Sequence, residues 1–483
     1  MVPLLALLAA ASRSAPAPTG LHVNHEPNEA LAVPADDVVL GWAVPAAGGA
    51  QASFRVRLTA GSGALLGEFA CAPSPRINCS RSDGISLRSL TAQHPSFALP
   101  AGATVGVAVQ LVDSAGARGG WSAPFYFATA LAEGAWPGGA VPVWAKNATQ
   151  NLVLLRRSFV ADAEREHLLH ITAHAVPNRM PGGGANATKL LCSYKLWLNG
   201  EPLAVGPGRP TGEGSTIQDP AQLYDTLNIT ALLRHGQENV IAVQSFYWNN
   251  AQERAEVPSA FQVEGDEGDL GGVLVLVRSG STVVAASGDD GWLAFDRGDS
   301  ALLRAVRPPG CENFCRNNPN PSCNFCTIVG GRYHLMHEHW NMAVMPTGWQ
   351  LPAYVPKHSD WSPPVQRAKP FSRLGPKGAR AIALVAHAPS IRAVTPSGAG
   401  DFKCASGGGF CYIVDMNREI QGGLNITFER GTAGQQLTVR ASETLLPSGA
   451  VQFNGSDDSV HWDVWTLAAG RQTVVTHEYI EAR

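Results

Sequence analysis

The residues with the most evident chemistry are four cysteines and three histidines in one stretch. The cysteines have the spacing C-x3-C-x7-C-x2-C, and the histidines follow shortly after the last of them: Cys311, Cys315, Cys323, Cys326, His334, His337 and His339. In a reducing compartment this set would predict a zinc site, and in an oxidising one it predicts two disulfides that close a long loop. The signs of export given below favour disulfides, with zinc or free thiols as the alternatives. The order HEHW lacks the HExxH spacing of a metalloprotease helix.

The other cysteines are also close in sequence. Cys71 with Cys79 and Cys404 with Cys411 predict two small disulfide loops. The chain has nine cysteines, so one is left over. We expect it to be Cys192, as a buried thiol within an apolar strand pattern.

A second constellation could bind a sugar. The segment FYWNN ends a predicted strand and supplies Trp248, Asn249 and Asn250. An aromatic ring can stack on the apolar face of a sugar, and amides can bond its hydroxyls. The acidic run EGDEGD follows and supplies Asp266, Glu267 and Asp269, oxygen ligands of the kind that Ca²⁺ prefers. In the alternative interpretation Trp248 is a core residue and the acidic run is a solvated loop.

Several function classes find no support. The net charge is −3 and there is no basic block, so we expect neither nucleic acid nor an anionic membrane as a partner. No Gly-x-Ser-x-Gly elbow lies between a strand and a helix, and the Gly-rich stretches lack the Lys-Ser/Thr of a phosphate loop. No cofactor is required by any motif, and calcium is the one ion that the acidic run would take.

The N-terminus and the glycosylation motifs indicate export. Residues 4–11 are apolar and are followed by small residues and Pro, which predicts a signal peptide over residues 1–16. A disordered Ala-rich leader is the alternative, since no Lys or Arg precedes the apolar run. Six N-x-S/T sequons point to a secreted glycoprotein: Asn78, Asn147, Asn186, Asn228, Asn425 and Asn454. We therefore expect an extracellular protein.

Strand patterns must position these groups, because helical periodicity is scarce. Val105, Val107, Val109 and Leu111 alternate with small or polar residues, and residues 273–277 form a continuous apolar run. A further strand ends at the turn pair Asn199-Gly200. Such runs at hairpin spacing predict an all-β chain of tandem β-sandwiches.

Three modules follow from length and linkers. Residues 17–131 predict a fibronectin III- or immunoglobulin-like sandwich, with Trp42 on a buried strand. A Gly/Pro-rich linker separates it from residues 138–366, which are long for a minimal sandwich and carry the Cys-rich loop. The third module is predicted over residues 370–483.

Scattered motifs resemble the bacterial-type α-L-rhamnosidases. In the first module these are QASFRV at 51–56 and the segment 121–131, which reads Trp-Ser-x-Pro and then Phe-x-Thr-x-Leu. In the second they are the hairpin YKLWLNG, the stretch YDTLNITALLRHGQENVIAV, DDGW, Gly348-Trp349 and Ser359-Asp360-Trp361. The third adds Val414-Asp415, Gly422-Gly423 and the segment 443–449. The resemblance implies an immunoglobulin-like module, a galactose-binding-like jelly roll and a further β-sandwich, followed by a catalytic (α/α)6 barrel.

The resemblance also implies what to expect of activity. Members of the family hydrolyse terminal α-L-rhamnosides with inversion, which needs two carboxyl groups about 6.5–9.5 Å apart. In the family both belong to the helical barrel, and residues 1–483 contain no helical region of that kind, so we assign no catalytic residue. The last module is expected to be cut short at its C-terminus, and whether the chain is enzymatic stays open.

Three hypotheses remain. The first is the N-terminal part of an α-L-rhamnosidase-like glycoside hydrolase, whose modules bind carbohydrate and act as a scaffold. The second is a stand-alone, lectin-like protein without hydrolase activity, and the third a structural or adhesive surface protein. Under the first two, the expected partners are rhamnose-containing glycans or glycosides.

Overall fold

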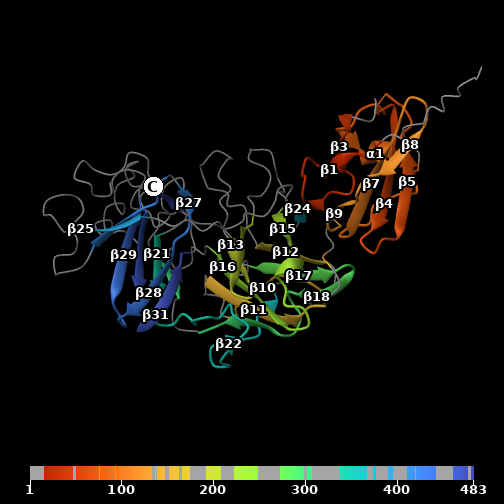
Figure 1. The fold of residues 1–483 in the computed structure, drawn as a ribbon. Coiled ribbons are helices and arrows are strands. Elements are labelled where there is room, and N and C mark those ends of the chain that lie inside the picture. Colours follow the sequence, from red (N-terminus) through yellow and green to blue (C-terminus); the bar gives the residue numbers. More distant parts are fainter. Residues whose placement is uncertain are drawn as a thin grey trace, which may run out of the picture.

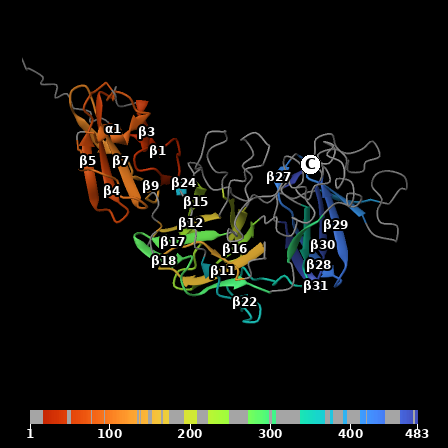
Figure 2. The ribbon, with the colours of Figure 1, turned by 180° about the vertical axis from the view of Figure 1, so that it is seen from behind.

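The computed structural model confirms an all-β chain (Figures 1 and 2). It describes residues 16–46, 51–75, 77–92, 94–132, 136, 139–146, 152–162, 166–173, 192–207, 222–247, 272–297, 302–306, 337–366, 374–376, 390–394, 411–418, 420–441, 461–476 and 480–482. Within these residues the helices are α1 (Leu87–Leu90) and the 3-10 turn η2 (Thr230–Leu232). Neither of these described helices has the length and apolar character needed to cross a membrane.

The first sandwich packs a small sheet on a larger one. The small sheet has the order β1 (Thr19–Val23), β3 (Val39–Ala43), β6 (Ile85–Ser86). The larger sheet has the order β2 (Ala30–Val33), β9 (Phe125–Thr129), β7 (Thr104–Val112), β4 (Ser53–Ala60), β5 (Leu65–Ala70), and β8 (Arg118–Trp121) pairs with β7.

The alternation in β7 places its apolar side chains in the core of this sandwich, as predicted. Val105, Val107 and Val109 are fully buried, and Trp42 of β3 packs edge-on against Phe54 of β4. The indole N–H of Trp42 is buried but donates to Gln51 Oε1 at 3.0 Å, which avoids the cost of an unpaired buried donor.

The central sandwich has two sheets. One, here called sheet D, has the order β23 (Val365–Gln366), β10 (Val143–Trp144), β17 (Val273–Ser279), β12 (His167–Ala173), β15 (Gln222–Asn228), β24 (Leu374–Pro376), and β18 (Thr282–Ala286) pairs with β17. The other, sheet E, has the order β14 (Glu201–Gly206), β13 (Cys192–Leu198), β16 (Glu238–Tyr247), β11 (Leu152–Val160), β19 (Trp292–Phe295), β22 (Trp361–Ser362).

Local sequence explains the register of this sandwich. Asn199 and Gly200 have φ of 55° and 92° and join β13 to β14, as expected of an Asn-Gly hairpin turn. Glycine is favoured at position 200 because a φ of 92° is one that residues with a β-carbon seldom adopt. Between the two sheets, the hydroxyl of Tyr194 on β13 donates to Asp225 Oδ2 on β15.

The C-terminal strands form four smaller sheets. The largest has the order β20 (Leu303–Val306), β21 (His337–Asn341), β30 (His461–Thr466), β29 (Gln436–Ala441). The two-stranded ones pair β25 (Ser390–Val394) with β26 (Cys411–Asp415), β27 (Ile420–Gly422) with β32 (Ile480–Ala482), and β28 (Asn425–Gly431) with β31 (Gly470–Val475).

Strand pairing crosses the predicted limit between the second and third modules. β21, from the predicted second module, runs parallel to β30, with His339 opposite Val464. Conversely, β24 lies beyond residue 370 but pairs in parallel with β15 of sheet D. The chain therefore exchanges strands between these two modules, which ties them together through backbone hydrogen bonds.

Both outer faces of the central sandwich are covered. On sheet E, apolar residues of β11, β13 and β16 share one buried cluster with Trp340, Trp465 and other residues of the C-terminal strands. On sheet D, Leu276 and Tyr224 pack with Ala32 and Leu131 of the first sandwich. Figure 1 shows the three β bodies in chain order, with the central one in the middle.

Candidate functional site

The predicted sugar-binding residues follow directly on a described strand. β16 ends at Tyr247, and its last residues pair with the first residues of β11 and β13 through Phe246–Leu152 and Tyr247–Cys192. One end of sheet E thus gathers three strand termini. Trp248, Asn249 and Asn250 lie outside the described residues, as do Asp266, Glu267 and Asp269, so both sets remain predictions.

The outer face of sheet E carries a buried arginine. Arg156 on β11 is 4% exposed and donates from Nη1 to the carbonyl oxygen of Tyr354 at 2.9 Å and from Nη2 to that of Leu351 at 3.4 Å. Its guanidinium lies 5.4 Å from the ring centroid of Tyr354. Burial lowers the pKa of Arg156, with Glu238 acting in the opposite direction. This side chain holds segment 342–361 against the sheet.

Lys195 on β13 has a similar role on the same face. It is buried and donates from Nζ to the carbonyl oxygen of Thr476, at the end of β31. Its strand neighbour Gln244 on β16 is buried as well. Since these polar groups face protein and not solvent, the covered part of sheet E is not an open sugar-binding face.

A tryptophan cluster completes this cover. Trp349 and Trp361 have ring centroids 6.2 Å apart, and Trp197 of β13 lies 5.8 Å from Trp349 in an edge-on arrangement. Trp361 Nε1 donates to the hydroxyl of Tyr354 at 3.0 Å. The Gly-Trp and Ser-Asp-Trp motifs of the sequence are therefore packing motifs, which attach segment 342–361 to sheet E.

The outer face of sheet D holds titratable groups under the first sandwich. Tyr224 accepts from the backbone N–H of Leu131 at 2.9 Å, and burial raises its pKa to about 12. His170 is fully buried, 6.0 Å from Tyr224 between ring centroids, and its Nδ1 lies 2.9 Å from Thr226 Oγ1. Burial, and secondarily Arg278, lowers the pKa of His170 to about 3. These groups are neutral at pH 7 and enclosed, which suits a joint between modules.

Two charged residues extend this joint. Arg278 on β17 donates to the carbonyl oxygen of Gly102 at 2.6 Å, and burial lowers its pKa. Glu166 accepts from the hydroxyl of Thr104, and its pKa is raised mainly by burial. Each contact links the first sandwich to the central one.

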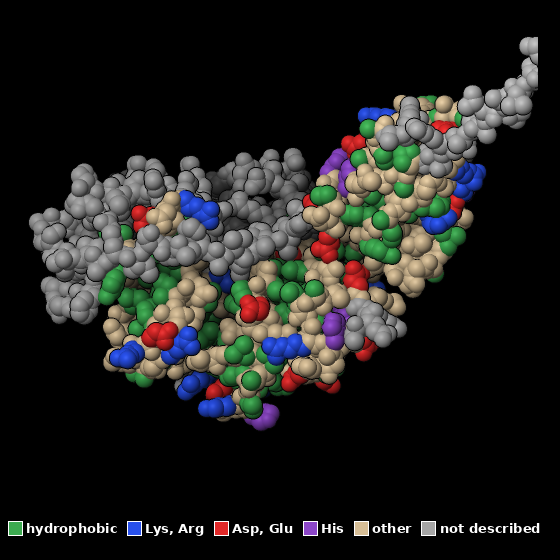
Figure 3. All heavy atoms as spheres, in the orientation of Figure 1, with side chains coloured by type: hydrophobic (Ala, Val, Ile, Leu, Met, Phe, Trp, Pro, Cys, Tyr) green, Lys and Arg blue, Asp and Glu red, His purple; other side chains and the backbone are tan. Residues whose placement is uncertain are grey.

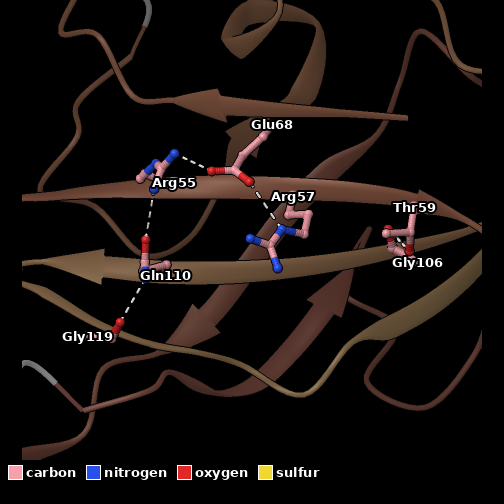
Figure 4. Close-up of polar contacts among 7 residues, drawn as sticks. All are labelled: Arg55, Arg57, Thr59, Glu68, Gly106, Gln110 and Gly119. Atoms are coloured by element: carbon pink, nitrogen blue, oxygen red, sulfur yellow. Dashed lines mark hydrogen bonds and ion pairs between the residues drawn. The ribbon is translucent and has the colours of Figure 1, made fainter. Parts of the chain in front are cut away.

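A half-buried polar ladder lies on the larger sheet of the first sandwich (Figure 4). Glu68 on β5 pairs with Arg55 and Arg57 on β4, and the Arg57 guanidinium lies 4.0 Å from the ring centroid of Trp121. Arg55 also donates to Gln110 at 3.3 Å. Charges of both signs are interspersed on the face of the molecule in Figure 3, in keeping with the absence of a basic block in the sequence.

One predicted disulfide is formed in the described residues, between Cys71 and Cys79. Cys192 opens β13 and Cys411 opens β26. The other predicted disulfide residues lie outside the described part of the chain: Cys311, Cys315, Cys323, Cys326 and Cys404. Their pairing remains a prediction.

Three of the six sequons are described. Asn78 is exposed, and its Oδ1 accepts from the backbone N–H and the hydroxyl of Ser80. Asn228 makes the same pair of bonds with Thr230 but is half-buried and also donates to Glu166. Asn425 is exposed at the start of β28. Asn147, Asn186 and Asn454 lie outside the described residues.

Sequence reasoning did not identify Arg156, Lys195 or His170. Each occupies the second face of a strand whose first face is apolar, so the strand sequence contains a charged or titratable residue among apolar ones. A strand buried on both faces reads as a nearly continuous apolar run. A basic or titratable residue within such a run is therefore the signal that points to a buried contact with another module.

The fold was compared with known proteins. No family model matches the sequence, and no curated protein matches it. Among solved structures, the α-L-rhamnosidase of Dictyoglumus thermophilum is similar over 98% of this chain and 47% of its own length, with a TM-score of 0.58 and 14% identity. The Streptomyces avermitilis α-L-rhamnosidase, solved in complex with L-rhamnose, is similar over 97% and 55%, with a TM-score of 0.55 and 13% identity.

These likenesses define a class at the level of fold. The chain has the tandem β-sandwich architecture found in α-L-rhamnosidase structures, over nearly all of its 483 residues. It spans about half the length of each of these two proteins.

Proposed function

We propose that this chain is the N-terminal, β-sandwich part of a secreted α-L-rhamnosidase-like glycoside hydrolase that acts on terminal α-L-rhamnosides. The observation that carries the proposal is the likeness to two α-L-rhamnosidases across all three β bodies, over 98% and 97% of the chain. Sandwich folds serve many functions, and a likeness that extends across several modules and their connections is more specific than one shared sandwich.

The covered faces support a scaffold role with sugar binding at an edge. The outer faces of sheets D and E are occupied by the neighbouring modules. The end of sheet E where β16, β11 and β13 have their termini is where the Trp-Asn-Asn segment begins. Loops at the end of a rigid sandwich are common places for binding groups. We assign rhamnoside binding to this end, with calcium as the ion that the acidic run later in the sequence would take.

The experiment is equilibrium binding of L-rhamnose to the 483-residue chain by isothermal titration calorimetry. We expect saturable binding at least about tenfold tighter than that of L-fucose, a 6-deoxy sugar of different hydroxyl configuration. Trp248→Ala together with Asn250→Ala should abolish it, and the matched control Trp121→Ala, beside the polar ladder of the first sandwich, should not. Equal, weak binding of both sugars would overturn the assignment of the sugar site.

Hydrolysis is measured separately, with 4-nitrophenyl α-L-rhamnoside. The resemblance implies that the acid and base would belong to a helical barrel, so we expect the 483 residues alone to bind the glycoside without releasing nitrophenol. Rapid release by this chain would show that a carboxyl pair of the β-sandwiches carries the reaction. Binding of rhamnose by a natural protein that never hydrolyses it would favour the stand-alone lectin-like alternative.

A further inference from the structure

Three side chains of metal-ligating type meet on the first sandwich, far in sequence from the predicted sugar-binding loops. They are His22 on β1, His25 in the turn after β1, and Asp83 in the loop before β6. One ligand atom from each lies within 4.8 Å of the other two, and within the described residues no other group of three has this property. We propose that His22, His25 and Asp83 bind a divalent ion of the zinc class.

The distance between two of the proposed ligand atoms, on His22 and Asp83, fits a metal site. His22 Nε2 lies 3.4 Å from Asp83 Oδ1. With bonds of about 2.0–2.2 Å, two ligands of a tetrahedral zinc ion are about 3.4 Å apart. His25 and Asp83 are exposed, so their side chains can rotate to close the third edge of the site.

A glycine leaves room for this pair. His22 lies opposite Gly41 in the β1–β3 ladder. A β-carbon on residue 41 would stand 2.3 Å from His22 Nε2 and 2.5 Å from Asp83 Oδ1. Any other residue would therefore push both ligand atoms out of their present positions.

The tautomer of His22 is set by the backbone. Its Nδ1 lies 3.2 Å from the carbonyl oxygen of Gly20, which can only accept, so Nδ1 carries the hydrogen. The lone pair of the neutral ring is then on Nε2, the atom that faces Asp83. Ligating histidines commonly donate their other N–H to a backbone carbonyl in this way, which fixes the ring orientation.

The turn that carries His25 is held in an uncommon conformation. Asn24 and His25 have φ of 49° and 64°, in the left-handed region that non-glycine residues seldom adopt. Asn24 secures the turn, because its Oδ1 accepts from Val39 N at 2.7 Å and its Nδ2 donates to Asp37 O at 2.9 Å. The His25 ring is thereby placed 5.9 Å from the His22 ring, between centroids.

The donor set selects the metal. Two imidazole nitrogens and one carboxylate oxygen suit zinc, copper or nickel, whereas calcium prefers oxygen ligands only. Three protein ligands leave a fourth position open to solvent. An ion held here would bridge β1 to the loop before β6 and so stabilise the small sheet of the first sandwich, by mass action on the folded state.

The test is Zn²⁺ titration of the whole chain by calorimetry, in a non-chelating buffer with the disulfides intact. The variants are His25→Asn, which keeps a residue tolerant of the left-handed region, and Asp83→Asn, which keeps an acceptor for the backbone N–H of Gly84. His358→Asn, at an exposed histidine outside the first sandwich, is the control. We expect each site variant to lose one zinc equivalent or at least about tenfold in affinity, and the control to lose neither.

The Cys-rich stretch could also bind zinc. The proposal is therefore tested by the difference in zinc stoichiometry and affinity between the wild type and the site variants. Thermal unfolding without metal should give the same midpoint for the wild type and both site variants, and only the wild type and the control should gain from added zinc through this site. Gly41→Ala should weaken binding of the same equivalent, since it displaces the ends of both ligand side chains. Unchanged zinc stoichiometry and affinity in His25→Asn and Asp83→Asn would overturn the proposal.

Discussion

The guanidinium of Arg156 donates to the carbonyl oxygen of Tyr354, 198 residues away, and so attaches a loop segment to a strand of the central sandwich. The arginine is buried, and its guanidinium also faces the Tyr354 ring. Arg156 and Lys195 together attach the segments that cover the outer face of sheet E. They therefore determine which parts of the central sandwich a ligand can reach.

Removing this guanidinium should destabilise the chain strongly. Arg156→Ala deletes a buried, hydrogen-bonded side chain and leaves the carbonyls of Tyr354 and Leu351 without this donor, for an expected loss of about 2–4 kcal/mol. Chemical denaturation at pH 7 measures it. Arg471→Ala is the matched control, since Arg471 and its partner Glu429 are 73% and 74% exposed. An exposed pair of that kind contributes about 0–1 kcal/mol. Equal losses for both variants would contradict the assigned role of Arg156.

Tyr224 should matter for the joint between the first two β bodies. Tyr224→Phe leaves the buried N–H of Leu131 without an acceptor, at a cost of about 1–3 kcal/mol. Limited proteolysis should then release the first sandwich faster than in the wild type. Tyr126→Phe, at a residue that is 48% exposed on β9, should leave the cleavage rate unchanged. A rate unaffected by Tyr224→Phe would show that other contacts hold the joint.

His170 should give the fold a pH dependence. Its pKa is lowered in the folded state to about 3 from an ordinary value of 6.5, mainly by burial. Between these values the unfolded chain binds a proton that the folded chain does not, so stability falls as the pH falls from 6.5 toward 3. The slope from this one group is at most about 1.4 kcal/mol per pH unit.

The measurement is the unfolding midpoint between pH 7 and 5, above the range where most carboxyl groups titrate. His170→Gln, which keeps a polar partner for Thr226, should make the unfolding midpoint depend less on pH than it does in the wild type. His358→Gln, at an exposed histidine, should preserve the slope. A wild-type curve that already rises toward acid in this range would contradict the burial of a neutral His170.

Glycosylation is a further prediction, which rests on the proposed secretion. Asn78 and Asn425 are exposed acceptors in the described residues. In protein secreted from a eukaryotic host we expect enzymatic deglycosylation to convert both to aspartate, as read by peptide mass spectrometry. Unmodified asparagine at both positions would count against secretion through the glycosylating pathway.

Local features of the fold could be predicted from the sequence, and long-range ones could not. The alternation of β7, the apolar run of β17 and the Asn-Gly hairpin each depend on a few neighbouring residues, and all three are confirmed. The parallel pairing of β21 with β30 joins segments about 125 residues apart and has no local signature.

Contacts between residues close in sequence could likewise be predicted, and those between distant residues could not. Cys71 and Cys79 are close in sequence, so their bond could be predicted from spacing. Arg156 and Lys195 take partners 195 to 281 residues away, and their role depends on a face that only the folded chain defines. The His22, His25 and Asp83 cluster needs the β1–β3 register, which places Gly41 opposite His22.

We infer that this chain is the β-sandwich part of an α-L-rhamnosidase-like hydrolase. Sequencing the mature transcript downstream of the Arg483 codon tests it most directly, because the two similar α-L-rhamnosidases are about twice as long as the region they share with this chain. We predict an open reading frame that continues into helix-patterned sequence with acidic residues suited to glycoside hydrolysis. A stop codon directly after Arg483 in the mature transcript would contradict the hydrolase assignment and leave glycan binding as the function to pursue.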